Sequence, residues 1–191
     1  MNRIATHNSS TGELPGSFWS WLITPFAKCQ SKTIKQQFNA GCRLFDIRVK
    51  YLDDEGWVCA HGMWYTKRSA ISILDEINNL PEVVEVDLTY EGDCKGNEAN
   101  FSQFVKYCKS VFKYIIWGGI AYKYSDDSKG IKVNYKYIAK ADKNYKGGVQ
   151  GFIPLDGRSW HTYIPIPWLW NKIYTRYHVF NKDKYIYVDF L

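Results

Sequence analysis

The chain has 191 residues, of which 46% are hydrophobic, and this fits a single globular domain spanning 1–191. Its net charge of +6 favours anionic partners such as phosphate esters or acidic lipid surfaces. The basic residues are spread along the chain and accompany no recognisable nucleic-acid-binding motif, so no nucleic-acid partner is predicted. The sequence has neither a basic-then-apolar leader nor a long apolar run, which argues against a signal peptide and a membrane span. A mature form that has lost its leader is the alternative.

The first predicted strand covers residues 1–8 and ends in the polar pair His7 and Asn8. Residues 13–28 then form an aromatic stretch. The simpler interpretation is a short helix or loop that caps the sheet, and the alternative is an aromatic rim that enters a lipid interface. The residues expected to form that membrane rim are Phe18, Trp19 and Trp21.

Residues 31–40 are predicted to form a helix that Gly41 ends, and the strand 41–51 follows directly. Side chains of a strand alternate between its faces, so Leu44, Asp46 and Arg48 point one way and their apolar neighbours the other. Burying either charge alone is costly, so we expect the two charges to pair with each other or with an anionic ligand. The alternative is an edge strand with a solvated face.

Strands and helices then alternate up to residue 112, which is typical of a parallel sheet. A strand at 56–62 contains His61, a helix is predicted at 69–80, a strand at 83–90 and an amphipathic helix at 101–112. Beyond residue 113 the pattern changes to strand-like runs without helical periodicity between them. Three such runs are expected, at 113–124, 130–140 and 184–191.

Residues 160–180 are aromatic, and one short helix is expected after Pro167. We interpret His161 and His178, which lie in this segment, as structural or surface residues. The five cysteines are odd in number and contain no CxxC pair, so we predict no disulfide framework and a reducing compartment such as the cytoplasm. Any membrane association is expected to be peripheral.

Polar or ionisable groups lie near the carboxyl ends of five apolar strands, which is how a parallel β/α barrel builds a site. A complete barrel typically needs ~250 residues, so we predict an irregular or shortened TIM-type barrel with its site at the carboxyl ends of the strands.

Two histidines with an arginine between them suit phosphodiester cleavage. One imidazole can accept a proton from the attacking hydroxyl and the other can donate one to the leaving oxygen. A guanidinium matches the phosphate oxygens, and a carboxylate can orient a histidine. His7, His61, Arg48 and Asp189 are the candidates for these roles. The alternative is that both histidines are structural.

At these residues the chain resembles the X-domain of phosphatidylinositol-specific phospholipase C, in its bacterial, metal-independent branch. The resemblance rests on THNSS at 6–10, GCRLFDIRV at 41–49 and AHG at 60–62, followed by a helix that ends in EIN. It extends to about residue 91, and the closing YIYVDFL resembles the last strand of the bacterial members.

The resemblance implies an irregular TIM-type barrel and a role for each matching residue. His7 would be the general base and His61 the general acid, while Arg48 would stabilise the transition state. Asp189 would orient His7, and Asp46 would support the site beside Arg48. The product would be a cyclic phosphodiester, which water could open later.

The resemblance also bears on metal and headgroup binding. Arg48 stands where calcium-dependent relatives have an acidic ligand, and its charge would replace the ion's, so we predict no metal and no cofactor. Asn8 stands where the bacterial branch usually has Asp, and the calcium-dependent branch also has Asn there, so calcium is the alternative. Thr89, in place of an expected basic residue, and Glu91 are the candidate substrate-binding residues.

The sequence therefore predicts a phospholipase C-type phosphodiesterase acting on a phospholipid. Two alternatives are a related enzyme that cleaves a soluble glycero- or nucleotide phosphodiester, and a phosphate-ester binding or assembly protein with the same fold. Glycerophosphodiester enzymes need a Glu-x-Asp pair for metal, and the Asp46-x-Arg48 pattern lacks the second acid.

Overall fold

The computed structural model describes residues 3–93, 97–124 and 185–188. Several predictions therefore lie outside the described residues. They are the role of Asp189, the strand at 130–140 and the aromatic segment 160–180 with its two histidines.

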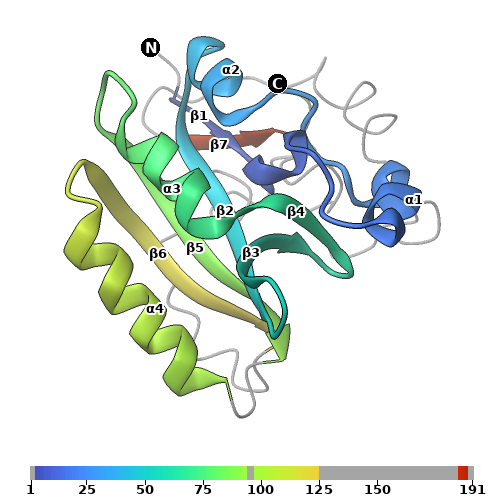
Figure 1. The fold of residues 1–191 in the computed structure, drawn as a ribbon. Coiled ribbons are helices and arrows are strands. Elements are labelled where there is room, and N and C mark those ends of the chain that lie inside the picture. Colours follow the sequence, from blue (N-terminus) through green and yellow to red (C-terminus); the bar gives the residue numbers. More distant parts are fainter. Residues whose placement is uncertain (1–2, 94–96, 125–184, 189–191) are drawn as a thin grey trace, which may run out of the picture.

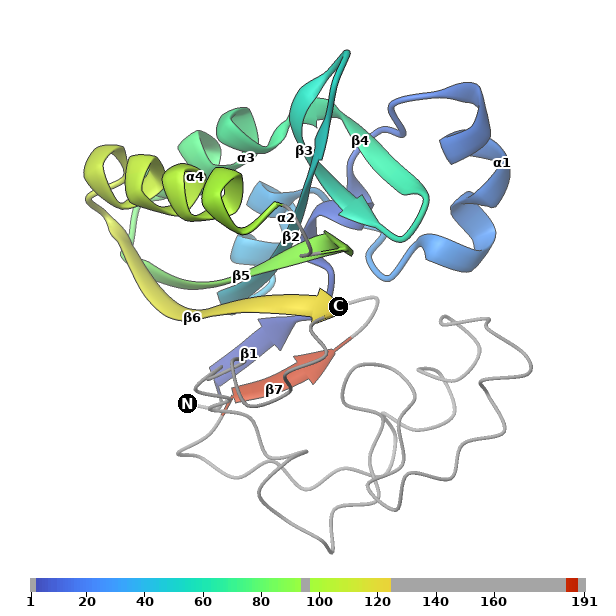
Figure 2. The same cartoon turned by 90° about the horizontal axis from the view of Figure 1, so that it is seen from below.

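The centre of the sheet is the long strand β2 (Cys42–Leu52). One edge of β2 pairs in parallel with β5 (Val84–Asp93), which in turn pairs in parallel with β6 (Ile115–Tyr124). The other edge begins in parallel with β1 (Arg3–Thr6), and β1 pairs in parallel with β7 (Tyr185–Val188). Five strands thus run side by side in one direction, and their carboxyl ends meet at one end of the molecule (Figures 1 and 2).

The prediction of a parallel sheet, with strands and helices alternating up to residue 112, was wrong between residues 56 and 69. Strand β3 (Gly56–His61) runs antiparallel to the end of β2, and β4 (Trp64–Ser69), which was not predicted, runs antiparallel to β3. The turn before Gly56 is far too short for the crossover that a parallel strand requires. The sheet is therefore mixed, and the strands that the structure describes do not form a closed barrel.

The helices form where local sequence signals place them. Helix α2 (Ile34–Asn39) begins at Thr33, whose side chain forms a capping box with Gln36. It ends before Gly41, whose φ of 102° suits glycine. Two further helices, α3 (Ala70–Asn78) and α4 (Glu98–Val111), follow in the chain.

The predicted alternation along β2 is confirmed. Phe45, Ile47 and Val49 are fully buried in the core against residues of α3 and α4. Both helices lie over the same face of the sheet (Figure 2). Leu44, Asp46 and Arg48 occupy the other face by alternation, so that face receives the charged residues.

Helix α1 (Phe18–Ala27) lies beside β4, at the end of the molecule toward which the parallel strands point (Figure 2). Ser17 caps its first turn, and its ten residues include no charged side chain. Two hydrogen bonds fix it to β4: Trp64 Nε1 donates to Thr24 Oγ1 at 3.1 Å, and Tyr65 N donates to Ser20 Oγ at 3.2 Å. Among the described residues, no helix is both long and apolar enough to cross a membrane.

The cysteines that the structure describes form no disulfide with one another. They are Cys29, Cys42, Cys59 and Cys108. Burial raises the pKa of the Cys42 and Cys59 thiols to about 12, so both remain neutral and pack as small hydrophobic side chains.

Candidate active site

Arg48 lies at the centre of a cluster at the carboxyl end of the sheet. Its Nη2 donates to His7 Nε2 at 2.8 Å, and its Nε donates to Asp46 Oδ2 at 3.1 Å. Its Nη1 forms an ion pair with Glu91 Oε2 at 3.5 Å. Both carboxylate side chains are almost completely buried, so the guanidinium is held in a fixed orientation by two anions and one imidazole.

These contacts fix the protonation of two groups. Burial alone would lower the pKa of Arg48, but the carboxylates of Asp46 and Glu91 outweigh it and raise the pKa above its ordinary value. A guanidinium has donors and no acceptor. The short contact therefore requires His7 Nε2 to be unprotonated and to accept the hydrogen bond from Arg48.

His7 follows β1 directly and is placed by a tight turn. Asn8 adopts the left-handed conformation at φ 47°, which Asn tolerates better than most residues, and the 3₁₀ turn η1 (Ser9–Gly12) follows. Asn8 N donates to Asp46 Oδ2 at 3.1 Å, and Gln30 Nε2 donates to His7 O at 3.1 Å. The peptide group that joins His7 to Asn8 is thus held at its oxygen by Gln30 and at its nitrogen by Asp46.

The resemblance places Asn8 where the bacterial branch usually has Asp. In the structure Asn8 is fully buried, and among the described residues neither its Oδ1 nor its Nδ2 has a hydrogen-bond partner. The contact from Asn8 to the cluster comes from its backbone N–H, which binds Asp46.

His61, at the end of β3, is oriented by a backbone carbonyl. Its Nδ1 lies 2.7 Å from Ala27 O, and a carbonyl only accepts, so Nδ1 carries a proton and Nε2 is left for other partners. Cys29 Sγ lies 3.9 Å from the same Nδ1. The ring centroids of His61 and His7 are 6.2 Å apart.

Burial lowers the pKa of His61 from 6.5 to about 4, and the positive charge of Arg48 adds to this effect. Glu91 opposes it. The His61 imidazole is therefore neutral at neutral pH when the site contains only the protein.

Glu91 joins two parts of the cluster. Its Oε2 contacts Arg48, and its Oε1 accepts from Gly62 N at 2.8 Å, in the turn that follows His61. Thr89 lies directly opposite Arg48 on the neighbouring strand and is partly exposed.

The structure thus brings together six of the predicted site residues, which are His7, Asn8, Asp46, Arg48, His61 and Glu91, and places Thr89 beside them. Asp189 lies outside the described residues. The sequence prediction missed Ala27 and Cys29, the neighbours of His61. A backbone carbonyl leaves no residue-type signal, so Ala27 could not have been found that way.

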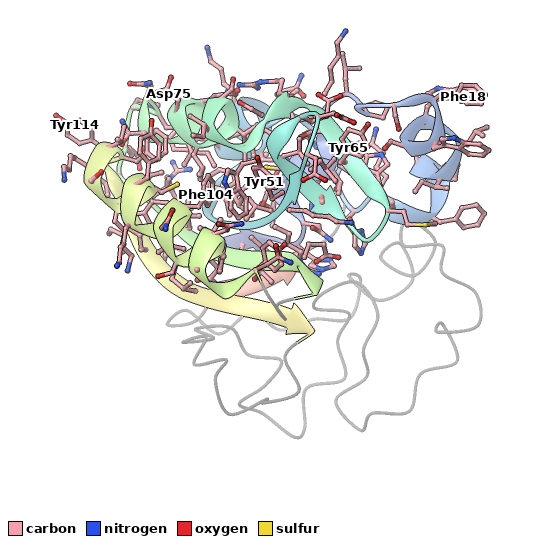
Figure 3. All side chains as sticks on the ribbon, turned by 60° about the horizontal axis from the view of Figure 1, so that its bottom comes forward. Phe18, Tyr51, Tyr65, Asp75, Phe104 and Tyr114 are labelled. Carbon is pink, nitrogen blue, oxygen red and sulfur yellow. The ribbon has the colours of Figure 1, made fainter. Side chains whose placement is uncertain are left out.

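An exposed apolar surface lies at the same end of the molecule. The three predicted rim residues of α1 are exposed, and Trp19 is 73% accessible. Figure 3 places Phe18 at the opposite end of the molecule from Tyr114, which immediately precedes β6. Met63, which was not predicted, is 80% exposed in the turn beside His61. We name Phe18, Trp19, Trp21, Leu22, Phe26 and Met63 the apolar rim.

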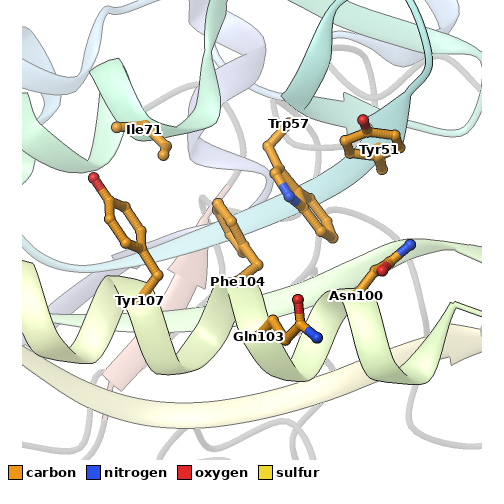
Figure 4. A pocket seen from close by; sticks show the side chains of 7 residues that line it. All are labelled: Tyr51, Trp57, Ile71, Asn100, Gln103, Phe104 and Tyr107. Atoms are coloured by element: carbon orange, nitrogen blue, oxygen red, sulfur yellow. The ribbon is translucent and has the colours of Figure 1, made fainter.

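A separate pocket of about 410 Å³ lies between the β2–β3 hairpin and helices α3 and α4 (Figure 4). It is lined by aromatic and carboxamide side chains and one isoleucine, which are Tyr51, Trp57, Ile71, Asn100, Gln103, Phe104 and Tyr107. Its lining includes none of the clustered histidine, arginine or carboxylate residues, so this pocket is distinct from the candidate active site.

No protein-family model matches the chain, and no curated protein matches its sequence. Solved structures do match it. A mutant of the phosphatidylinositol-specific phospholipase C from Staphylococcus aureus aligns with a TM-score of 0.56 and 15% identity, covering 100% of this chain and 85% of that one.

Two further alignments are partial. Another structure of the S. aureus enzyme covers 62% of this chain, with a TM-score of 0.44 and 19% identity, and the enzyme from Listeria monocytogenes covers 61%, with a TM-score of 0.41 and 20% identity. In these two alignments the chain spans about half the length of the enzymes, 47% and 50%. The alignment over the whole chain shows that this protein shares the fold of the bacterial phosphatidylinositol-specific phospholipases C.

Proposed function

We propose that this protein is a phosphodiesterase of the phosphatidylinositol-specific phospholipase C type, which cleaves its substrate by general acid–base catalysis. The observation that carries the proposal is the convergence of His7, Arg48 and His61 at the carboxyl end of the parallel strands. The shared fold supports the same reaction class. In this proposal the chain as a whole has the irregular TIM-type barrel that its sequence predicts.

In the proposed reaction, His7 accepts the proton of a substrate hydroxyl, whose oxygen then attacks phosphorus. Arg48 donates to the phosphate oxygens as negative charge develops on them. The bond from phosphorus to the leaving oxygen breaks, and His61 Nε2 donates a proton to that oxygen. The product is a cyclic phosphate, and Asp189 would orient His7. Water could later open the ring, with the two histidines exchanging roles.

The general acid must hold a proton, whereas His61 is neutral in the free protein at neutral pH. The charge of Arg48 is one cause of the low pKa of His61. A bound phosphodiester carries a negative charge that offsets the charge of Arg48. We therefore expect substrate binding to raise the pKa of His61 and to favour the protonated form that the reaction requires.

We propose that no metal takes part. Asp46 and Glu91 supply the oxygen atoms that calcium prefers, but Arg48 is ion-paired to both carboxylates. A calcium ion between them would have to displace a buried guanidinium and leave it without those partners. The residues present therefore fit calcium poorly.

A phospholipid is the proposed substrate, and the apolar rim is the proposed membrane contact. Tryptophan and phenylalanine side chains on a helix without charges suit the interface of a bilayer. The S. aureus enzyme that shares the fold has been studied for its membrane binding. Thr89 is the proposed headgroup contact, and Glu91 would act there through Arg48 and Gly62.

The test is turnover of phosphatidylinositol in vesicles, with and without EDTA. We expect activity that survives EDTA and is lost in His7→Ala and in His61→Ala. Full activity in both variants would exclude the mechanism. Binding of inositol phosphate without turnover of any phosphodiester would instead identify a binding or assembly protein, and turnover only of soluble phosphodiesters would identify the related enzyme class.

A further inference from the structure

The nitrogen that would act as the general base is occupied in this structure. Arg48 Nη2 donates to His7 Nε2 at 2.8 Å, so the lone pair that would accept a substrate proton is already engaged. A base in this state cannot accept the proton of a hydroxyl until the guanidinium N–H finds another acceptor.

The other two nitrogens of the Arg48 guanidinium contact carboxylates. Nε donates to Asp46, whose carboxylate is also held by Asn8 N, and Nη1 faces Glu91, whose carboxylate is also held by Gly62 N. Both carboxylates are buried and charged, so they are stronger acceptors than a neutral imidazole. The Nη2–His7 contact is the shortest of the three, but its acceptor is neutral where the other two are anionic, so it is the contact that an anionic oxygen replaces most readily.

We infer that Arg48 is a cap on the general base that the phosphate group of the substrate removes. A phosphate oxygen accepts the Nη2 N–H in place of His7 Nε2, because an anionic oxygen is the better acceptor. The exchange moves one hydrogen bond, transfers no proton and allows the Nε2 lone pair of His7 to accept the proton of the substrate hydroxyl. This inference rests on the proposed function, since it concerns how the same site is activated by its phosphodiester.

The proposed cap and a simple phosphate-binding site predict opposite effects of removing the His7 imidazole on anion affinity. If His7 competes with phosphate for the same N–H, removing the imidazole should strengthen anion binding. The probes are inorganic phosphate and dimethyl phosphate, titrated into the full chain and followed by NMR. We expect His7→Ala to bind both anions roughly ten-fold more tightly than the wild type, as expected for removing one hydrogen bond to a charged group.

Matched variants separate the cap from other effects. His7→Gln places an amide oxygen where Nε2 stood, so it should retain the competition and bind phosphate about as the wild type does. His61→Ala leaves the cap intact and should not tighten binding. Near-UV circular dichroism checks that each variant is folded.

Equal or weaker binding of either anion in folded His7→Ala would overturn the inference. A second measurement applies to the unmodified protein: the ¹⁵N shift of His7 Nε2 should move when dimethyl phosphate saturates the site, and no movement would equally overturn the cap. Neither measurement requires turnover. A failure of the proposed function would appear separately, as the absence of phosphodiester cleavage.

Discussion

Replacing Glu91 by glutamine tests whether the buried charges around Arg48 act as one unit. Glu91→Gln retains an oxygen that can accept from Gly62 N but removes the negative charge 3.5 Å from Arg48 Nη1. At an effective dielectric constant of 20, that separation corresponds to a gross attraction of roughly 5 kcal/mol. The relieved cost of burying a carboxylate offsets part of this loss, and Arg48 retains Asp46. We therefore expect a net loss of about 2 kcal/mol in the free energy of unfolding.

The assay is urea unfolding of Glu91→Gln beside a matched control, Glu82→Gln. Glu82 also pairs with an arginine, at 3.0 Å from Arg43, but its side chain is 61% exposed. Exposed pairs contribute roughly 0–1 kcal/mol, so the control should change the midpoint little. Equal midpoints for the two variants at unchanged m-value would refute the view that Glu91 is an energetically coupled partner of Arg48.

Three further predictions follow from the geometry. The pKa of His61 is lowered to about 4, so NMR titration of the free protein should show a neutral ring at pH 6. Because the unfolded chain binds this proton more readily, the free energy of unfolding should fall as the pH decreases from about 6.5 toward 4. A normal titration of His61 near 6.5 would contradict the burial argument. Trp19→Ala, Trp21→Ala and Met63→Ser should each reduce flotation with anionic liposomes, and unchanged flotation in all three would exclude the apolar rim as the membrane contact. Gly118→Ala would place a methyl group against the carboxylates of the neighbouring strand, so we expect a loss of about 1–3 kcal/mol in urea unfolding, whereas wild-type stability would show that the strand can move aside.

The sequence predicted the faces of β2 because charge placement is a strong local signal. Asp46 and Arg48 are separated by one residue, so they must share a face, and the apolar residues between and around them must occupy the other. The helix stop at Gly41 was an equally local signal and is seen in the structure, whereas the helix begins at Ile34 and not at residue 31. Each of these features depends on neighbours within a few positions, which a single sequence contains.

The β3–β4 hairpin escaped prediction because its second strand lacks an apolar alternation. In β4 the buried positions include Thr66, whose hydroxyl contacts the backbone of β3 at Cys59, and the run therefore resembles a polar loop. The hairpin determines where His61 lies in the site. Because β3 runs back along β2, it places His61 beside the cluster of Arg48 and Glu91.

In the resting site, the two imidazoles are alike in the protonation of their Nε2 atoms. His7 Nε2 accepts from Arg48, and His61 has its proton on Nδ1, held by the carbonyl of Ala27. Neither Nε2 atom then carries a proton at neutral pH, whereas a general acid–base pair needs one protonated and one unprotonated nitrogen. A phosphodiester anion would change both histidines. It would accept the Arg48 N–H in place of His7, and it would offset the positive charge that lowers the pKa of His61. In the mechanism proposed here, the substrate's own charge therefore turns two proton acceptors into a base and an acid.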